Sequence, residues 1–289
     1  MRALDRLAPP LFIFIWATGY IAAKLAAPFA DPLTFLSWRY AGVLVLMLGL
    51  ALAARAPWPS PRQMLHLAVA GIGIQALYLG GVWVAIRQGL PAGTAALIVN
   101  LQPVLVAALA PLIGERVSLR QWAGVALGLV GVLLVIWHKL TLAASFGPPL
   151  LLCLMALAGI TAGTLYQKRV VPQFDLRTGQ VVQFAASLAV TLPVAWALEP
   201  MRIEWNLQVA AAMAWSILVL TAGGISLMFY MLRQGRVTAV TSTMYLVPSV
   251  TAVMAWALFG ETLGAQAIAG MVITLFGVYL VVARKEAAR

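Results

Sequence analysis

Charged residues are scarce in this sequence: they occupy only 9% of its 289 positions, whereas 63% of the residues are hydrophobic. A soluble domain carries charge on roughly a quarter of its residues, and the mean hydropathy of +0.97 is far above that class. The single cysteine, Cys153, excludes an intrachain disulfide and any cysteine-based metal site. Together these absences exclude an ordinary cytosolic enzyme, a disordered chain and a disulfide-stapled scaffold.

Acidic residues are especially few, because 8 Asp and Glu stand against 19 Lys and Arg, which leaves a net charge of +11. Such a balance can indicate a nucleic-acid partner. In so apolar a chain the better interpretation is basic loops held at the cytoplasmic face of a membrane. We therefore expect the lipid bilayer as partner and no nucleic acid.

The hydrophobic residues are arranged in long runs separated by turn-forming residues. A membrane-spanning helix needs about 20 apolar residues, and the chain contains ten candidate runs of about this length. They are residues 9–27, 32–54, 64–86, 94–113, 120–137, 148–167, 177–198, 207–232, 238–259 and 265–283. The predicted fold class is an all-α membrane protein with ten transmembrane helices joined by short loops.

Basic residues divide unequally between alternate loops. Fourteen lie on one side of the expected membrane and three on the other, and Lys24 and Arg39 fall inside spans. Basic residues of short loops concentrate on the cytoplasmic side. This distribution predicts that both the N-terminus and the C-terminus are cytoplasmic.

The two halves of the chain share a pattern of residues in the same order. Arg87-Gln88-Gly89 recurs as Arg233-Gln234-Gly235, and Gly114-Glu115 recurs as Gly260-Glu261, in each case 146 positions later. Because each half contains an odd number of expected spans, the second half must enter the membrane from the opposite face. We predict two inverted five-helix repeats, residues 1–144 and 145–289. Inverted repeats are frequent in secondary transporters, which place their substrate site near the midplane between the halves.

The motifs Trp16-Ala17-Thr18-Gly19, Pro103 with Gly114-Glu115, and their counterpart Pro248 with Gly260-Glu261 carry a resemblance to a known family. By these residues the chain resembles the drug/metabolite transporter (DMT) superfamily, in its ten-helix EamA branch. Within that branch it is most similar to YddG-type exporters, which are associated with aromatic and other amino acids and with paraquat. The resemblance implies multi-pass insertion in a bacterial inner membrane, with both halves around a central cavity.

Polar and aromatic side chains inside the spans are the candidates for a substrate path. They are expected either to line the cavity or to pack and form hydrogen bonds between helices. The candidate cavity-lining residues are Trp16, Tyr20, Gln75, Tyr78, Trp83, Asn100, Gln102, Tyr166, Tyr230 and Tyr245.

Lys24 and Arg39 are the candidate buried charges. Lys24 lies four residues before Pro28 and can extend its amine to the outer headgroups. Arg39 lies seven residues past Pro32, roughly 10 Å along a helix, where a guanidinium is costly without a partner or water. It is expected either to bind a substrate carboxylate or to bond backbone carbonyls and Asp31.

Pro103 and Pro248 are expected near the middle of the fourth and ninth spans. Proline removes a helical hydrogen bond and bends the helix. The two residues are therefore predicted to act as gating hinges, with a static kink as the alternative.

No acidic residue is expected at mid-membrane, since all eight fall in loops or at span ends. Proton-coupled transporters commonly use a carboxylate or histidine at membrane depth. The prediction is therefore facilitated export, by alternating access, of amino acids (aromatic or otherwise neutral) and similar small metabolites. A proton-driven exporter of drugs or organic cations remains the alternative.

Catalytic motifs are also missing. Gly71-Ile72-Gly73-Ile74-Gln75-Ala76 fits a dinucleotide-binding pattern on paper, but it lies in an apolar span rather than after a strand. A membrane-embedded lipid enzyme would need clustered carboxylates or histidines at one interface. We predict that the chain is not an enzyme, needs no cofactor or metal, binds a small-molecule substrate, and exists as a monomer or weak dimer.

Overall fold

A computed structural model describes residues 3–109, 111, 117–141, 147–233, 246–261 and 264–282 of the chain. Within these ranges the protein is helical, and the only β-type pairing is an isolated bridge between Ala30 and Ile203. The predicted all-α class is therefore confirmed for the part of the chain that is described.

The first half begins with two uninterrupted α-helices. The third helical run contains a π-helical turn between two α-helices, and the fourth consists of two short α-helices. The helices are α1 (Ala3–Ala26), α2 (Pro32–Ala53), α3 (Pro61–Gly71), the π-helix η1 (Ile72–Leu77), α4 (Tyr78–Arg87), α5 (Ala92–Val99), α6 (Gln102–Leu109) and α7 (Leu119–Thr141).

The second half repeats this order. Its helices are α8 (Gly147–Val170), α9 (Leu176–Leu198), α10 (Leu207–Ala214), the π-helix η3 (Trp215–Gly223), α11 (Gly224–Arg233), α13 (Val247–Phe259) and α14 (Ala265–Val282).

Six helical segments are long and apolar enough to cross a membrane. They are Leu7–Ala26, Pro32–Ala53, Pro61–Arg87, Ala92–Leu109, Gly147–Val170 and Leu176–Leu198. Three shorter apolar helices are Leu207–Gly223, Val247–Phe259 and Ile268–Leu280. The count of ten spans, the inverted orientation of the halves and the cytoplasmic termini stay predictions.

Helix starts use the same chemistry at equivalent positions of the two halves. The Ser60 hydroxyl caps α3 by accepting a hydrogen bond from the Gln63 N–H, and Gln63 Oε1 accepts one from the Ser60 N–H, which forms a capping box. Asn206, 146 positions later, caps α10 through the Val209 N–H. Such caps satisfy N–H groups that the first helical turn leaves without partners.

The chain folds into two compact units, and neither unit coincides with a sequence half. Unit 1 comprises residues 1–21, 89–150 and 222–289, and unit 2 comprises residues 22–88 and 151–221. Each unit therefore contains helices from both halves. The repeat limits 1–144 and 145–289 describe similarity of sequence and stay a prediction about repeats.

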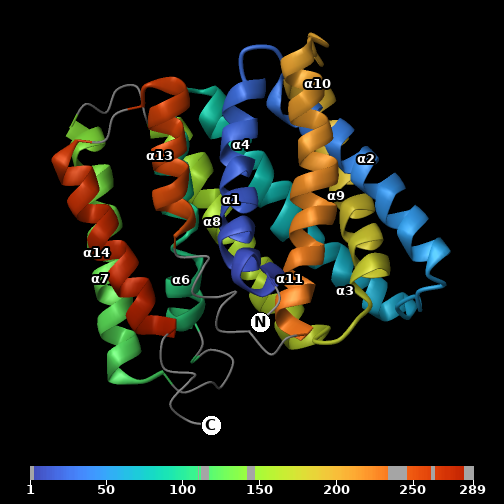
Figure 1. Ribbon diagram of the computed structural model, residues 1–289, viewed down its shortest axis with the longest axis horizontal. Helices are drawn as coiled ribbons and strands as arrows, with labels where there is room; N and C mark the ends of the chain where they lie inside the picture. Colours follow the sequence, from blue (N-terminus) through green and yellow to red (C-terminus); the bar gives the residue numbers. More distant parts are fainter. Residues whose placement is uncertain are drawn as a thin grey trace. The chain divides into compact units, whose positions relative to one another are not determined.

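In unit 1, α7 and α14 pack along each other at glycine positions (Figure 1). A Cβ atom added at Gly131 would lie 2.5 Å from the Gly270 carbonyl oxygen. One added at Gly277 would lie 2.7 Å from the Gly124 carbonyl oxygen. Since Gly131 and Gly277 are 146 positions apart, as are Gly124 and Gly270, the contact is reciprocal and the two helices run antiparallel.

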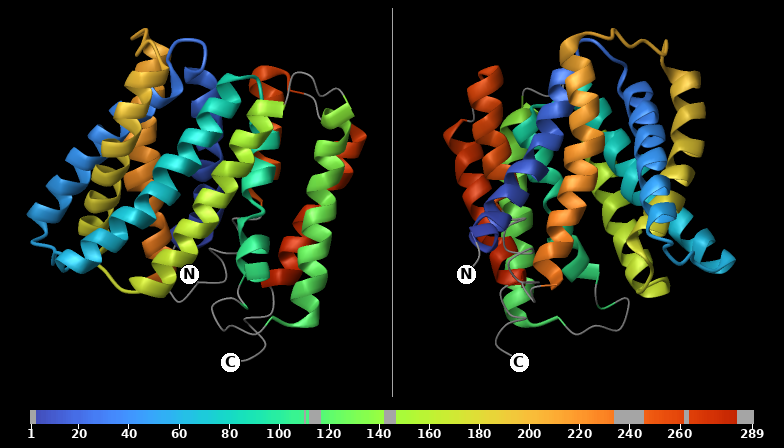
Figure 2. Two further views of the ribbon diagram at one scale, coloured as in Figure 1. Left: turned by 180° about the vertical axis from the view of Figure 1, so that it is seen from behind. Right: turned by 45° about the vertical axis from the view of Figure 1, so that its right-hand side comes forward.

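In unit 2, α2 and α9 form a second antiparallel pair of equivalent helices (Figure 2). At its centre the rings of Tyr40 and Phe184, 144 positions apart, lie 5.6 Å from each other. At one end the Glu199 carboxylate accepts hydrogen bonds from the N–H groups of Leu33 and Thr34, at 2.9 and 2.8 Å. Aromatic contact and a charged cap thus hold this pair together, where unit 1 uses glycine.

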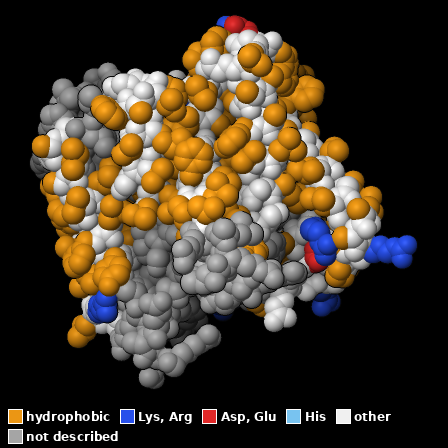
Figure 3. Space-filling view, in the orientation of Figure 1, with side chains coloured by type: hydrophobic (Ala, Val, Ile, Leu, Met, Phe, Trp, Pro, Cys, Tyr) orange, Lys and Arg blue, Asp and Glu red, His pale blue; other side chains and the backbone are white. Residues whose placement is uncertain are grey.

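Over each unit, the face visible in Figure 3 is covered mainly by hydrophobic side chains. Large apolar residues such as Trp196, Val45 and Val272 are well exposed. A helical surface of this kind is suited to contact with lipid chains.

Candidate functional site

A group of polar residues lies within unit 2 where α2 meets the π-helix η1. We call Arg39, Tyr40, Gln75 and Tyr78 the Arg39 cluster. Arg39 and Tyr40 come from α2, Gln75 from η1, and Tyr78 begins α4. Three of these residues, Arg39, Gln75 and Tyr78, were predicted from the sequence, and the fold brings them together.

Arg39 is buried, with 9% of its surface exposed. Its Nε atom has no hydrogen-bond partner among the described residues. Among the described residues, Tyr40 and Tyr78 are the titratable side chains near its guanidinium. A buried donor without an acceptor is costly, so this arginine holds hydrogen-bonding capacity that the described side chains leave unused.

The π-helix supplies the backbone contact of the cluster. The Tyr40 hydroxyl donates a 2.8 Å hydrogen bond to the Gln75 carbonyl oxygen. A π-helical turn displaces carbonyl groups from the regular α-helical ladder, and such turns are frequent at functional sites. The second π-helix, η3, contains residues 218–223, which lie 146 positions after η1. The irregularity is therefore repeated in both halves.

A second polar group in unit 2 lies on the α9 side. The Gln183 side chain donates a 2.6 Å hydrogen bond to Gln167 Oε1. Ser187 donates to the Gly71 carbonyl at 3.0 Å and to the Gln183 carbonyl at 2.7 Å. Gly71 makes room for this approach, because a Cβ there would lie 2.7 Å from the Gln183 Cα. Gln183 is the counterpart of Arg39, 144 positions later.

Tyr166, another predicted residue, forms a pair with His66. Its hydroxyl lies 2.7 Å from His66 Nδ1, and their ring centroids are 5.8 Å apart. Both side chains are half-buried. The pair joins α3 to α8 within unit 2.

Trp83 and Lys24 take other positions in unit 2. Trp83 is buried and stacks on Phe35, with ring centroids 4.6 Å apart. Lys24 lies in the last turn of α1 and is half-buried. Trp83 is thus part of the packed interior. A cavity-lining role for Trp83 and a role as buried charge for Lys24 stay predictions.

Two of the predicted aromatic residues in unit 1, Trp16 and Tyr230, lie against the same cluster of buried residues. This cluster consists of Ala8, Phe12 and Met231. Tyr20 is buried, with 4% of its surface exposed. Tyr245 lies outside the described residues.

The predicted hinge at Pro103 coincides with a break in the helix. The helix α5 ends at Val99 and α6 begins at Gln102, one residue before Pro103. Asn100 caps the break, since its backbone N–H and its side-chain Nδ2 both donate to the Ala96 carbonyl, at 3.0 and 2.7 Å. Pro248 occupies the first turn of α13. Whether either proline acts as a gate stays a prediction.

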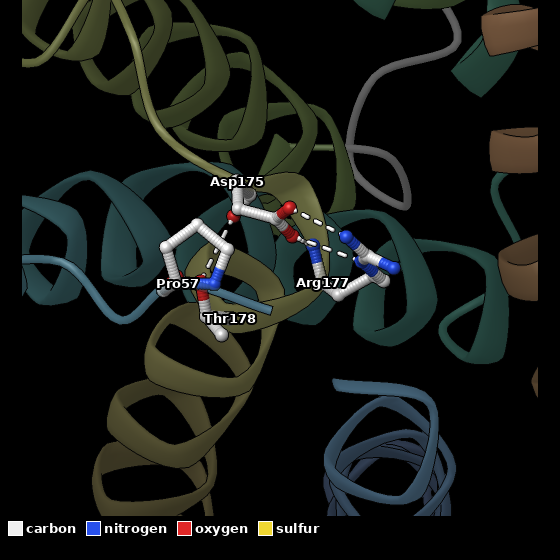
Figure 4. A network of polar contacts seen from close by, with 4 residues as sticks. All are labelled: Pro57, Asp175, Arg177 and Thr178. Carbon is white, nitrogen blue, oxygen red and sulfur yellow. Dashed lines mark hydrogen bonds and ion pairs between the residues drawn. The ribbon is translucent and has the colours of Figure 1, made fainter. Parts of the chain in front are cut away.

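Every acidic residue whose contacts are described lies at or beyond a helix end. Asp31 accepts from the Arg202 N–H at 2.8 Å, and Arg202 pairs with Glu204 at 3.6 Å. Asp175 pairs with Arg177 at 2.7 Å beside a hydrogen bond from Thr178 to the Pro57 carbonyl (Figure 4). The bond from Arg177 holds the pKa of the Asp175 carboxyl below its usual range.

Sequence reasoning missed Tyr40, the two π-helices and the Glu199 cap. Glycine pairs near each π-helix, such as Gly71 with Gly73, are a weak signal of an irregular helix. No sequence pattern indicated that Glu199 meets residues 165 and 166 positions earlier.

Comparisons with a family pattern and with individual proteins point to the same family of transporters. The sequence pattern of the EamA-like transporter family matches residues 11–137 and again residues 147–283. The inner membrane transporter YedA of Escherichia coli (strain K12), described as uncharacterized, is 24% identical over 92% of this chain and 87% of its own. A probable amino-acid metabolite efflux pump of Salmonella typhimurium (strain LT2) is 24% identical over 97% of this chain and 95% of its own.

A solved crystal structure shares the fold. It covers 99% of this chain and 100% of its own, with a TM-score of 0.65 and 18% sequence identity. Because the family pattern spans nearly the whole chain in two matches, and the helices are apolar enough to cross a membrane, the chain belongs to the EamA-like transporter family of the drug/metabolite transporter superfamily, as a membrane transporter and not an enzyme.

Proposed function

We propose that this transporter exports neutral or zwitterionic amino acids and similar small metabolites across a bacterial inner membrane. The position of its acidic residues supports the proposal most directly. Asp31, Asp175 and Glu199 are engaged in hydrogen bonds at the ends of α2 and α9. The buried residues of the described spans thus offer aromatic, amide and hydroxyl groups with one arginine, Arg39, a set that suits a zwitterion better than a cation.

The relatives agree with this substrate class, because one of them is named as a probable amino-acid metabolite efflux pump. The reciprocal packing of α7 on α14 and of α2 on α9 supports inverted repeats. Alternating access follows from such a construction. In this proposal the predicted aromatic and polar residues of both sequence halves contribute to the substrate path, and both termini are cytoplasmic.

Counterflow in proteoliposomes tests the proposal. Purified protein is reconstituted, the vesicles are loaded with one unlabelled amino acid, and entry of the labelled compound is followed for aromatic, aliphatic and acidic amino acids. We expect protein-dependent counterflow of at least one neutral amino acid, unchanged when a protonophore removes the pH gradient. Absence of counterflow across the panel, with monodisperse protein, would contradict amino-acid transport.

The same vesicles test the alternative of a proton-driven organic-cation exporter. Glu261 lies just after α13, and its Oε1 accepts a 3.4 Å hydrogen bond from the Ala92 N–H. Uptake of methyl viologen that requires a pH gradient and disappears in Glu261→Gln would replace the proposed function with the alternative.

A further inference from the structure

Arg39 combines burial with unused hydrogen-bonding capacity inside a membrane-spanning helix. It lies seven residues after the first residue of α2, roughly 10 Å along the helix axis. Only 9% of its surface is exposed, and its Nε has no partner among the described residues. A cation this far from water needs a counter-charge or strong acceptors.

The described acidic residues do not supply that counter-charge. No ion pair joins Arg39 to a described carboxylate, and each of these carboxylates has a contact elsewhere. The contacts are Asp31 with the Arg202 N–H, Asp175 with Arg177, Glu199 with the α2 N-terminus, Glu204 with Arg202, and Glu261 with the Ala92 N–H. The partner considered from the sequence, Asp31, is thus occupied at the start of the helix.

The equivalent position in the second half shows that the helix pair does not require a cation there. Gln183 occupies that position on α9, and its amide is satisfied by Gln167 at 2.6 Å. Both positions adjoin the aromatic contact of Tyr40 with Phe184. A neutral side chain therefore serves the packing role, and the charge of Arg39 calls for an explanation other than packing.

We propose that Arg39 binds the carboxylate of the transported molecule and makes a free carboxylate a condition for transport. This inference rests on the proposed function and narrows its substrate class to amino acids with an unmodified carboxyl group. The guanidinium is planar and offers parallel N–H donors that match the two oxygens of a carboxylate. In a site away from water, such charge-assisted bonds are the stronger kind of hydrogen bond.

The test compares amino acids with their carboxamides. Counterflow is measured for phenylalanine, leucine and methionine and for the amide of each, which keeps the side chain and amine but removes the negative charge. The variants are Arg39→Gln, which is neutral, and Arg39→Lys, which keeps the charge but not the planar fork. Arg62→Gln is the matched control, because Arg62 is an exposed residue in the first turn of α3.

We expect wild-type protein and Arg62→Gln to favour the acid over its amide by about tenfold or more in kcat/KM, the range of a charge-assisted bond. In Arg39→Gln the ratio should fall to about one, with Arg39→Lys intermediate. The acid, but not the amide, should also raise the thermal unfolding midpoint of the wild-type protein in detergent, because a ligand stabilises the state that it binds.

Three results would overturn the inference. The first is equal transport of acid and amide by the wild-type protein, which decides the matter even if Arg39→Gln does not fold. The second is an acid preference that persists in a well-folded Arg39→Gln. The third is absence of amino-acid counterflow in the wild-type protein, which removes the proposed function as well, whereas the first two leave it standing.

Discussion

Each unit contains one antiparallel pair of equivalent helices, and the two pairs are held together by different means. In unit 1, α7 and α14 approach through Gly131 and Gly277, so closely that backbone meets backbone. In unit 2, α2 and α9 meet through Tyr40 and Phe184, with hydrogen bonds at their ends. A glycine contact has no side chain that can adapt, whereas an aromatic and polar contact tolerates different residues on its two sides.

Because the contact between α2 and α9 tolerates different side chains, the two helices can carry different residues at equivalent positions. The backbone repeats closely: Arg55 and Met201, 146 positions apart, follow α2 and α9 and both have positive φ angles, 47° and 60°. Arg39 and Gln183 nevertheless differ in charge at equivalent positions. Two helices with a repeated backbone can therefore differ in the charge of equivalent residues, provided that side chains rather than backbone atoms make the contact between them.

The largest effect is expected from filling the glycine contact. Gly131→Ala and Gly277→Ala each place a methyl group against backbone atoms of the facing helix. Overpacking of this kind costs about 1–3 kcal/mol. Thermal unfolding in detergent should show a clear drop in the midpoint for both variants, of similar size because the contact is reciprocal.

Gly49→Ala is the control for that prediction. Gly49 lies in α2 and a Cβ there would meet nothing within 4 Å, so the substitution should be neutral or stabilise by about 0.4–1 kcal/mol. If Gly131→Ala were as harmless as Gly49→Ala, the close approach of α7 to α14 would be wrong.

A smaller effect is expected from breaking the amide pair of α9 and α8. Gln183→Leu leaves Oε1 of the half-buried Gln167 without its 2.6 Å donor. An unsatisfied polar group costs about 1–3 kcal/mol when it is fully buried, so we expect a loss at the lower end of this range. The double variant Gln183→Leu/Gln167→Leu removes both polar groups and should recover part of the loss. Chemical unfolding of the four proteins gives the coupling, and simple additivity of the two losses would argue against the pair.

The smallest effect is expected at the exposed end of the second pair. Asp175 caps α9 and binds Arg177 (Figure 4), and this contact lowers the pKa of the Asp175 carboxyl below its usual range. Its contribution to stability is therefore complete above the pKa of Asp175 in the unfolded chain and is lost as the pH falls through the lowered pKa of the folded protein. Because the pair is partly exposed and therefore screened by water, we expect the effect on stability to be the smallest of those described.

Asp175→Asn should lower the unfolding midpoint slightly at neutral pH and remove this part of the acid sensitivity. Glu204→Gln is the matched control, because it removes an exposed ion pair that caps no helix. Identical pH profiles for wild type and Asp175→Asn would show that the cap contributes nothing.

Helix positions followed closely from the sequence where an apolar run is uninterrupted. The span expected at residues 177–198 is α9, Leu176–Leu198, and that expected at 32–54 is α2, Pro32–Ala53. The run at 94–113 was expected as one span with a kink at Pro103. Ala92–Leu109 is one candidate span, and within it α5 and α6 are separated at residues 100 and 101. Hydropathy sets where a helix forms, but the place of a break depends on hydrogen bonds such as that of Asn100.

The candidate site was only partly predictable. A polar residue within an apolar run is visible in the sequence, so Arg39, Gln75 and Tyr78 were found. Their meeting was not, because it depends on the π-helix η1 and on the Tyr40 hydroxyl, which contact each other across 35 positions. Tyr166 was found, but its partner His66 lies 100 positions away.

What the sequence determined by itself is the class of molecule: a helical membrane transporter, since long apolar runs and a repeated family pattern are properties of the chain read in order. Tertiary structure alone decided that each compact unit draws helices from both sequence halves. It also decided that Arg39 is buried without a described partner for Nε while Gln183 is satisfied. The physical reason is that composition and periodicity act along the chain, whereas packing and hydrogen bonding join residues more than a hundred positions apart.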